Sequence, residues 1–265
     1  MSSPATVTEM LTVLAARELA GRRIVFAGIG LPTLAAALAA LTGAPDIEII
    51  YESGVTGAHP AGLPTTISDS ILVTGAEAVL PMPQLFGYVI QGQRIDTGFL
   101  GAAQIDRHGS LNSTMIGGSY ERPEHRLPGS GGAIEVMGHA REVFVVMRRH
   151  TPQTLVDRLD FVTSPAPSAA GSGAGAGVGV GVGVGGRQAS GRGVTRLITP
   201  LGVLTRADDE LVLRSVNPGV DVAQVRSATG WPLKLAADVS DAEPPTAEEL
   251  RLLRDVLDPG RIYLR

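Results

Sequence analysis

Short apolar runs and helix-like segments alternate along the first fifty residues. Ile24–Ala27 is a continuous apolar run, which is typical of a buried strand. The glycine-containing turn Gly28–Pro32 leads into an alanine- and leucine-rich segment that ends at Gly43, and this pattern predicts a helix. The β-branched run Ile49–Ile50 then begins another strand. A strand, a helix and a strand in this order predict a crossover that joins two parallel strands.

The rest of the chain continues this alternation. Thr6 and Thr246 each precede a glutamate by three residues, the spacing of a capping box, and we expect each to begin a helix. The first helix should bury Val7, Leu11 and Leu14. Further strands are expected at 71–74, 78–80, 98–106, 143–147, 194–199, 210–216 and 262–264, and further helices at 84–90 and 221–229. The predicted fold class is α/β, with an open, mostly parallel twisted sheet flanked by helices.

One stretch interrupts this pattern. From about Ser164 the chain loses its periodicity, and 168–193 is rich in glycine, alanine and valine, with Val-Gly repeats. Too few side chains could be buried there to offset the backbone entropy. We therefore expect 168–193 to be a disordered insertion within a single domain that spans residues 1–265.

Composition narrows the possible functions. The formal net charge of −4 provides no broad basic field, so we expect no nucleic-acid partner. The sequence contains no cysteine, which excludes disulfides and thiolate ligands. Its longest apolar window, Ile29–Leu41, is too short to span a bilayer. The first residues do not resemble a signal peptide, so we expect a cytoplasmic protein without a membrane partner.

Glu52 is the candidate catalytic residue. It directly follows the strand predicted from Ile49 and precedes Ser53-Gly54. Ligands of α/β folds bind at the carboxyl ends of strands. A carboxylate there can act as a base or as a nucleophile on an activated acyl group. It can equally be a structural group that caps the next turn.

Two glycine loops accompany Glu52. Gly28 and Gly30 begin a dinucleotide-like fingerprint, but its third glycine would fall on Thr33. This loop is either a tight turn or an acceptor of an anionic ligand at a helix N-terminus. The second loop, Gly129–Ala133, contains Ser130, Gly131 and Gly132, and its backbone N–H groups could accept an anion or form a flexible turn. Between the loops, Asn112 belongs to a cluster of amide and hydroxyl side chains at 110–114.

Other familiar sites are excluded by spacing. The five histidines, at positions 59, 108, 125, 139 and 150, include no pair at metal-ligand spacing, so we expect no zinc site. The sequence contains neither a Gly-x-Ser-x-Gly elbow nor a Walker A loop. The basic cluster Arg148–His150 follows a predicted strand and is either a phosphate contact or a solvated strand end.

Several motifs, taken in order, resemble the β subunit of family I CoA-transferases, especially the glutaconate CoA-transferase branch. They are Gly28–Pro32, Glu52-Ser-Gly54, Gly101–Asp106 with Gly109 and Asn112-Ser-Thr114, Gly129–Ala133, Asp160–Pro165 and Asp258–Gly260. The resemblance covers nearly the whole chain outside the Val-Gly stretch. Ser110 departs from it, since relatives often have asparagine there.

The resemblance implies a CoA-transferase/NagB-RpiA-like fold and a mechanism. The family's nucleophile falls on Glu52, which would carry first an acyl group and then CoA as a glutamyl-CoA thioester. Gly131 and Gly132 fall on the oxyanion or CoA side of the site, with Gly129, Ser130 and Asn112 beside them. It also implies an α subunit in a heterotetramer or larger assembly. Coenzyme A thioester and carboxylic acid are then substrates, and no bound cofactor or metal is expected.

Two alternatives remain open. One is an acyl-CoA hydrolase or lyase of the same fold, similar to steroid ring-opening or methylglutaconyl-CoA-decarboxylating enzymes; these tend to lack the glutamate, so Glu52 favours transfer. The other is a non-enzymatic sugar-phosphate sensor, which would require an additional DNA-binding segment. The acyl donor and acceptor are not evident from the sequence.

Overall fold

The computed structural model describes residues 4–60, 62–167 and 191–265. The chain divides into two compact units, one formed by Met1–Leu100 with Glu243–Arg265 and the other by Gly101–Ala242.

The first unit contains the predicted strand–helix–strand crossover. Strand β1 (Ile24–Ala27) leads through α2 (Leu31–Thr42) to β2 (Glu48–Tyr51), and β1 pairs in parallel with both β2 and β5 (Thr97–Leu100). The bounds of β1 and α2 confirm the prediction. The segment between β2 and β5 consists of short elements: β3 (Val55–Thr56), η1 (Ser70–Val73), β4 (Ala78–Val79), α3 (Met82–Gln84) and the π-helix η2 (Leu85–Ile90). Helices α1 (Val7–Glu18) and α6 (Ala247–Arg251), with its π-helical continuation η4 (Leu252–Leu257), complete the unit.

Both predicted capping boxes are present. The Thr6 hydroxyl accepts a hydrogen bond from the Glu9 N–H, and the Glu9 carboxylate accepts one from the Thr6 N–H. Thr246 and Glu249 form the same reciprocal pair at the start of α6. These contacts satisfy donors that a helix leaves unpaired at its N-terminus, so each helix begins where the spacing predicts.

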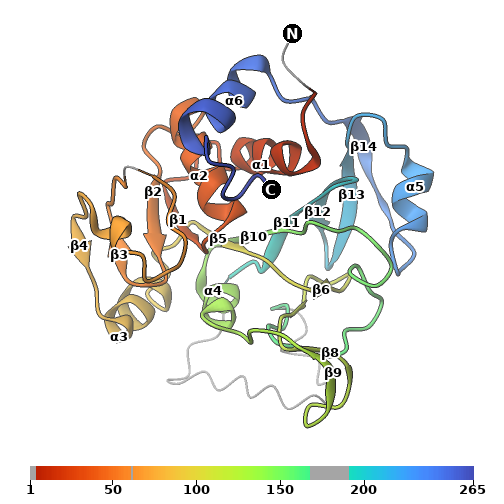
Figure 1. Ribbon diagram of the computed structural model, residues 1–265. Coiled ribbons are helices and arrows are strands. Elements are labelled where there is room, and N and C mark those ends of the chain that lie inside the picture. The colour runs from red at the N-terminus through yellow and green to blue at the C-terminus, as the bar shows by residue number, and fades with distance from the viewer. Residues whose placement is uncertain (1–3, 61, 168–190) are drawn as a thin grey trace. The chain divides into compact units, whose positions relative to one another are not determined.

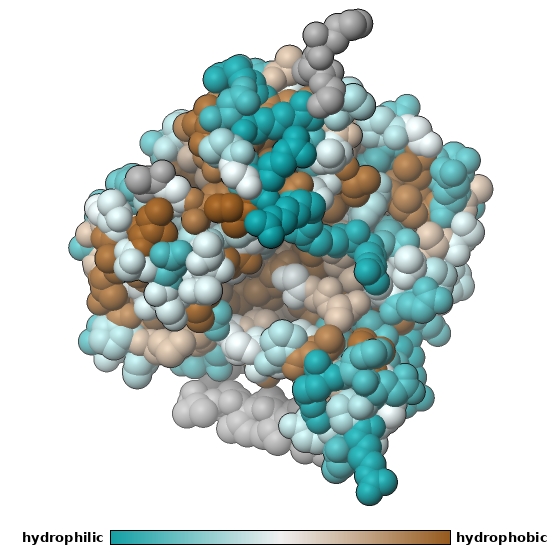
Figure 2. All heavy atoms as spheres, viewed as in Figure 1, coloured by the Kyte–Doolittle hydropathy of each residue, from teal (hydrophilic) through white to brown (hydrophobic). Residues whose placement is uncertain are grey.

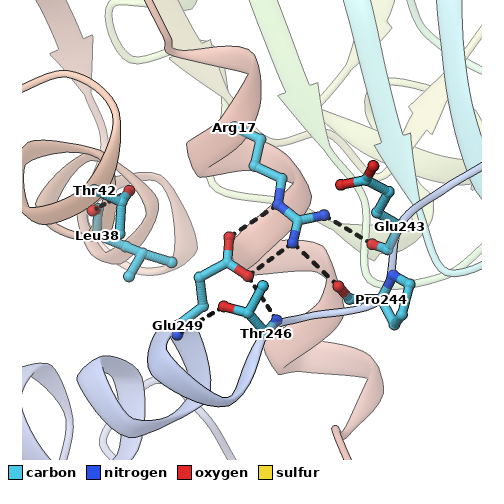
Figure 3. A network of polar contacts seen from close by, with 7 residues as sticks. All are labelled: Arg17, Leu38, Thr42, Glu243, Pro244, Thr246 and Glu249. Carbon is cyan, nitrogen blue, oxygen red and sulfur yellow. Dashed lines mark hydrogen bonds and ion pairs between the residues drawn. The ribbon is translucent and has the colours of Figure 1, made fainter.

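Helices α1 and α6 are also joined by ion pairs. The Arg17 guanidinium donates two hydrogen bonds to the Glu249 carboxylate, at 2.9 and 2.7 Å, and two more to the carbonyls of Glu243 and Pro244 (Figure 3). Arg254 donates similarly to both carboxylate oxygens of Glu9, at 2.7 and 2.8 Å. The two pairs fasten the C-terminal segment to the N-terminal helix, which explains why segments so far apart in sequence belong to one unit.

The second unit is built on a ladder of five strands. Its order is β10 (Glu142–Val146), β11 (Val194–Thr199), β12 (Gly202–Ala207), β13 (Glu210–Val216) and β14 (Leu235–Asp241). The first and last pairings are parallel and the two between them are antiparallel. Helices α4 (Ala133–His139) and α5 (Val222–Ser227), strands β6 (Gln104–Ile105) and β7 (Leu111–Asn112), and the hairpin of β8 (Met115–Gly118) and β9 (Pro123–Arg126) accompany this ladder (Figure 1).

The predicted α/β fold class is confirmed. Of the six pairings among β1, β2, β5 and β10 to β14, four are parallel (β1–β2, β1–β5, β10–β11 and β13–β14) and two antiparallel. The short pairs β3–β4, β6–β7 and β8–β9 are antiparallel. Helices accompany the strands in both units, as expected. None of the helices in the part of the chain that is described is long and apolar enough to cross a membrane.

Two predicted strands are wrong, and the strand predicted at 98–106 is divided into β5 and β6, because β5 pairs with β1 whereas β6 pairs with β7. Residues 71–74 lie mainly in the 3₁₀ turn η1, because the Asp69 carboxylate caps it by accepting the Ile71 N–H. At 262–264 the buried Asp258 carboxylate accepts three successive backbone N–H groups, from Ile262, Tyr263 and Leu264. Because these backbone N–H groups already have an acceptor, they do not need to pair with a neighbouring strand. The apolar face predicted for α1 also differs, because Val7 is exposed while Met10 and Val13 join Leu11 and Leu14 in the core.

Most of the Gly/Val-rich stretch predicted at 168–193 lies outside the described residues. Its last three residues do not. The Gly191 N–H donates to the Gly138 carbonyl, and the Gly193 carbonyl accepts from the Val143 N–H at the start of β10. On the other side, Ser164 is buried and its backbone pairs with Leu111. Both described flanks are therefore packed parts of the second unit.

Candidate active site

Glu52 lies in the turn that directly follows β2, at the carboxyl end of the parallel strands of the first unit. The Gly54 N–H donates to the Tyr51 carbonyl at 2.8 Å and closes a four-residue turn around Glu52 and Ser53. The Glu52 residue is half-buried. The predicted place of this carboxylate, at the rim of a sheet, is thus the observed one.

The turn is held firmly on both sides. Tyr51 and Val55 are buried with Leu72 in one apolar cluster, against which Ile29 and Ile49 also pack. Gly54 has a φ of +91°, and a Cβ atom at this position would lie 1.9 Å from the carbonyl oxygen of Leu80. The Leu80 N–H in turn donates to the Gly54 carbonyl. Only glycine meets both constraints, so the backbone that carries Glu52 has little freedom to shift.

The first glycine loop lies beside Glu52 at the same edge of the strands. Ala27, the last residue of β1, is opposite Tyr51 in the register, so the chain enters the Gly28–Gly30 loop next to the Glu52 turn. A Cβ atom at Gly28 or Gly30 would meet no atom within 4 Å. Burial raises the pKa of Tyr263 to about 12, and the Gly30 backbone of this loop acts in the opposite direction.

The second glycine loop, Gly129–Ala133, belongs to the second unit. The Ala133 N–H donates to the Ser130 carbonyl at 2.9 Å, which makes a tight turn, and φ is positive at Gly129 and Gly131. For the backbone N–H groups of Ser130 and Gly131, the described residues provide no hydrogen-bond acceptor. Gly131 is exposed and Gly132 is buried. The loop thus offers an open face with donors on it.

Asn112 lies near this loop but has a different role from that of an exposed donor. Its residue is fully buried, and its amide nitrogen donates to the Gln104 side-chain oxygen and to the Met115 carbonyl, at 2.8 and 2.7 Å. Its side-chain oxygen accepts from the N–H groups of Thr114 and Met115. All four hydrogen bonds that an asparagine side chain can readily make are used within the chain. Asn112 therefore shapes the turn at 112–115.

The turn at 112–115 also holds the second glycine loop. The Gly129 N–H donates to the Ser113 carbonyl at 2.8 Å, and the Leu127 N–H donates to the Thr114 carbonyl. The structure therefore brings Asn112 and Gly129 together in one network of the second unit. Glu52 belongs to the first unit.

Residues of this network that sequence reasoning did not single out are Gln104, Asp160 and Thr163. The Gln104 side chain accepts from Asn112 and from the Asp160 N–H, and donates to the Asp160 carboxylate. The Thr163 hydroxyl accepts from the Ser113 N–H and lies 2.7 Å from the Thr114 hydroxyl. Gln104 and Asp160 stood within motifs of the resemblance, but only the fold shows that they meet.

The basic cluster Arg148–His150 fits neither expectation completely. It is not fully solvated, and its histidine is not available to contact a phosphate. His150 is buried, with its two ring nitrogens 2.8 and 3.0 Å from the hydroxyls of Thr199 and Thr229. Burial lowers the pKa of His150 to about 4. A neutral imidazole held between two hydroxyls is a core group, whereas Arg148 and Arg149 are exposed.

Comparisons with known proteins show what the chain as a whole is similar to. The coenzyme A transferase family model matches residues 8–228. One of the subunits of the 3-oxoadipate CoA-transferase of Pseudomonas knackmussii is 42% identical over 251 residues, which cover 94% of this chain and 92% of that protein. The crystal structure of glutaconate coenzyme A-transferase from Acidaminococcus fermentans superposes with a TM-score of 0.85 at 28% identity and covers 98% of each chain. The IpdB chain of the cholesterol ring-cleaving hydrolase of Rhodococcus jostii is 29% identical over 86% of this chain and 82% of its own.

Proposed function

The chain belongs to the coenzyme A transferase family, and from this premise we propose that it is the β subunit of an enzyme that moves CoA between an acyl-CoA and a carboxylic acid. The observation that carries the proposal is a glutamate at the carboxyl end of a parallel strand, in a turn fixed by its buried neighbours. Such a turn fixes the backbone from which the carboxylate extends, which favours the precise placement that an attacking group requires.

In this mechanism Glu52 is the nucleophile. Its carboxylate attacks the carbonyl carbon of the acyl-CoA, the carbon–sulfur bond breaks, and CoA leaves as a thiolate from an acyl-glutamyl anhydride. The thiolate then attacks the glutamyl carbonyl of the anhydride, which releases the first acid and leaves a glutamyl-CoA thioester. An incoming carboxylate attacks that thioester, and the returning thiolate forms the new acyl-CoA and restores Glu52.

We assign the second glycine loop to the oxyanion or CoA side of the site. The N–H groups of Ser130 and Gly131 have no acceptor in the described parts of the chain, and Gly129 and Gly132 give the loop its tight path. Backbone donors of this kind stabilise negative charge that develops on a carbonyl oxygen. Asn112 acts as a positioning residue, since it holds the turn to which Gly129 is bonded. CoA is substrate in this scheme, and no bound cofactor or metal takes part.

The names of two relatives support a proposal for the class of acid. Their names denote 3-oxoadipate and glutaconate, which are both dicarboxylic acids. We therefore propose that this enzyme transfers CoA to or from a dicarboxylate, and that such acids are the first acceptors to test.

A partner α subunit completes the proposed enzyme, in a heterotetramer or larger assembly. Both of these relatives are named as subunits of their enzymes. The first unit also exposes large apolar side chains along residues 67–88, and Figure 2 shows hydrophobic surface over the region of β3, β4 and α3. The members of this apolar segment are Ile67, Val73, Val79, Met82 and Tyr88. Several large apolar side chains exposed in one region are typical of a protein interface.

Substitution of Tyr88, whose side chain is 73% exposed, tests this assignment. We expect Tyr88→Glu to weaken binding of the α subunit at least about tenfold, because an aromatic contact would be replaced by a charge that must be desolvated. The measurement is the dissociation constant of the two purified subunits. Tyr120→Glu is the matched control, since Tyr120 is an exposed tyrosine of the second unit. Equal affinities for Tyr88→Glu and the unchanged chain would remove residues 67–88 from the interface.

The proposed function is tested by trapping the intermediate. The chain is co-expressed with the product of the neighbouring gene, and the purified complex is incubated with glutaconyl-CoA or 3-oxoadipyl-CoA. Borohydride then reduces the enzyme thioester, and mass spectrometry locates the modified peptide. We expect the modification on the peptide that contains Glu52. Turnover with an unmodified Glu52 peptide would disprove the mechanism.

An acyl-CoA hydrolase of the same fold is the second candidate, and the 29% identity to one chain of a ring-cleaving hydrolase is the observation that favours it. The same complex distinguishes the two. A transferase forms a new acyl-CoA only when an acceptor acid is added, whereas a hydrolase releases free CoA without one.

A further inference from the structure

Ser53, the residue after Glu52, has a buried hydroxyl without a hydrogen-bond partner in the described structure. Buried hydroxyls are normally paired, because removing one from water without providing a new partner is unfavourable. An unsatisfied hydroxyl in a native fold therefore requires an explanation.

Four other side chains in the described residues share this property, and they provide a comparison. Thr97, Ser164, Asn217 and Trp231 each contain a buried polar atom without a partner. All four residues are almost completely enclosed by the core, whereas Ser53 is the one whose residue is only half-buried. A ligand can therefore approach the surroundings of Ser53, which it cannot do at the other four without opening the core.

The position of Ser53 is as constrained as that of Glu52. Both lie in the middle of the turn closed by the Gly54 N–H and the Tyr51 carbonyl, and Tyr51 is anchored in the apolar cluster. The unpaired hydroxyl is thus held at a fixed place, one residue from the carboxylate on which the thioester would form. Preorganised donors of this kind act on groups that arrive with the substrate.

We propose that Ser53 is a substrate-contacting residue whose hydroxyl donates a hydrogen bond to the carbonyl oxygen of the thioester or anhydride formed at Glu52. This inference rests on the proposed function. The hydroxyl has no acceptor among the described residues, and the adduct supplies one. The cost of the unsatisfied group in the resting chain is recovered when the adduct forms.

The proposal requires stability and activity to respond in opposite directions. Ser53→Ala removes a hydroxyl that makes no hydrogen bond to the part of the chain that the structure describes, so the melting temperature of the complex should stay the same or rise. Its kcat for CoA transfer should fall at least about tenfold, because the adduct loses one donor, while KM for the acyl-CoA changes little. Thr97→Val is the matched control, since it removes another unpartnered hydroxyl in the core of the same unit and should leave kcat unchanged.

The same borohydride trap separates this inference from the proposed function. We expect the native complex to accumulate the Glu52 adduct and the Ser53→Ala complex to form it at least tenfold more slowly in a single turnover. Native-like trapping and kcat in Ser53→Ala would overturn the role of Ser53 and leave the function intact. A loss of kcat matched by a fall in melting temperature would also overturn it, because a structural role would then account for the effect. A native complex that turns over without modification of Glu52 would overturn the proposed function, and the role of Ser53 with it.

Discussion

Replacing Glu52 with alanine is expected to abolish CoA transfer while leaving the protein folded. The proposed reaction has no alternative path once the attacking carboxylate is removed, because both covalent intermediates are built on it. The side chain is half-buried in a turn held by Tyr51, Val55 and Gly54, all of which keep their contacts in the variant. Stability should therefore change little. The measurements are the rate of CoA transfer to a dicarboxylate and the melting temperature of the complex.

Two further variants sharpen this test. Glu52→Asp retains a carboxylate but draws it back by one methylene, and we expect transfer to fall on the order of a hundredfold, since the attacking oxygen must be placed within a fraction of an ångström. Glu48→Gln is the control, because Glu48 lies at the other end of β2. Its carboxylate accepts a hydrogen bond from the Thr56 hydroxyl, and a glutamine amide oxygen can accept the same bond. Glu48→Gln should transfer CoA at the native rate. Residual transfer in Glu52→Ala comparable to that control would rule out the nucleophile.

The parts of the fold that were predictable from sequence are those in which local signals decide the outcome. The run Ile24–Ala27 is apolar throughout and pairs on both sides, and the capping boxes of α1 and α6 satisfy their own helix ends. Strands β12 and β14 were not predicted. Strand β14 is largely exposed and lies at the end of its ladder, so its sequence shows no buried pattern, and the placement of both strands depends on pairing with β13.

The candidate site was predictable to a similar degree. The position of Glu52 at the end of a strand followed from the residues around it, and the resemblance to the CoA-transferase family is confirmed. The contacts of Asn112 were not predictable, because they depend on Gln104, which meets Asp160 across 56 positions of sequence. Sequence reasoning placed Asn112 on the ligand side of the site, whereas burial and four internal hydrogen bonds favour a positioning role.

The largest expected effect on stability comes from the ion pair between Glu9 and Arg254. Glu9 is 1% exposed, and the Arg254 guanidinium donates to both of its carboxylate oxygens. Replacing Arg254 with methionine leaves a buried carboxylate without its countercharge, a change that costs about 3–5 kcal/mol in other proteins. We expect the free energy of unfolding of Arg254→Met to fall by about 3 kcal/mol at pH 7. Arg251→Met is the control, because Arg251 pairs with an exposed glutamate whose attraction is screened by water, so the free energy of unfolding should change far less.

The pH dependence of this loss identifies its cause. Hydrogen bonds from Arg254, opposed by burial, lower the pKa of Glu9 from 4.5 to about 2. A carboxyl group whose pKa is lower in the folded than in the unfolded chain stabilises the fold above pH 4.5, and this contribution disappears as the pH falls towards 2. A shift of this size corresponds to about 3 kcal/mol. The difference in unfolding free energy between the native chain and Arg254→Met, measured by urea unfolding, should therefore be largest near neutral pH and shrink below pH 4.

Adding Glu9→Gln to Arg254→Met should recover much of the loss at pH 7, because the amide oxygen can still accept a hydrogen bond from the Thr6 N–H while the buried charge is gone. A loss that stayed constant with pH, or that the second substitution did not relieve, would mean that Arg254 stabilises the fold through packing of its aliphatic stem rather than through its charge.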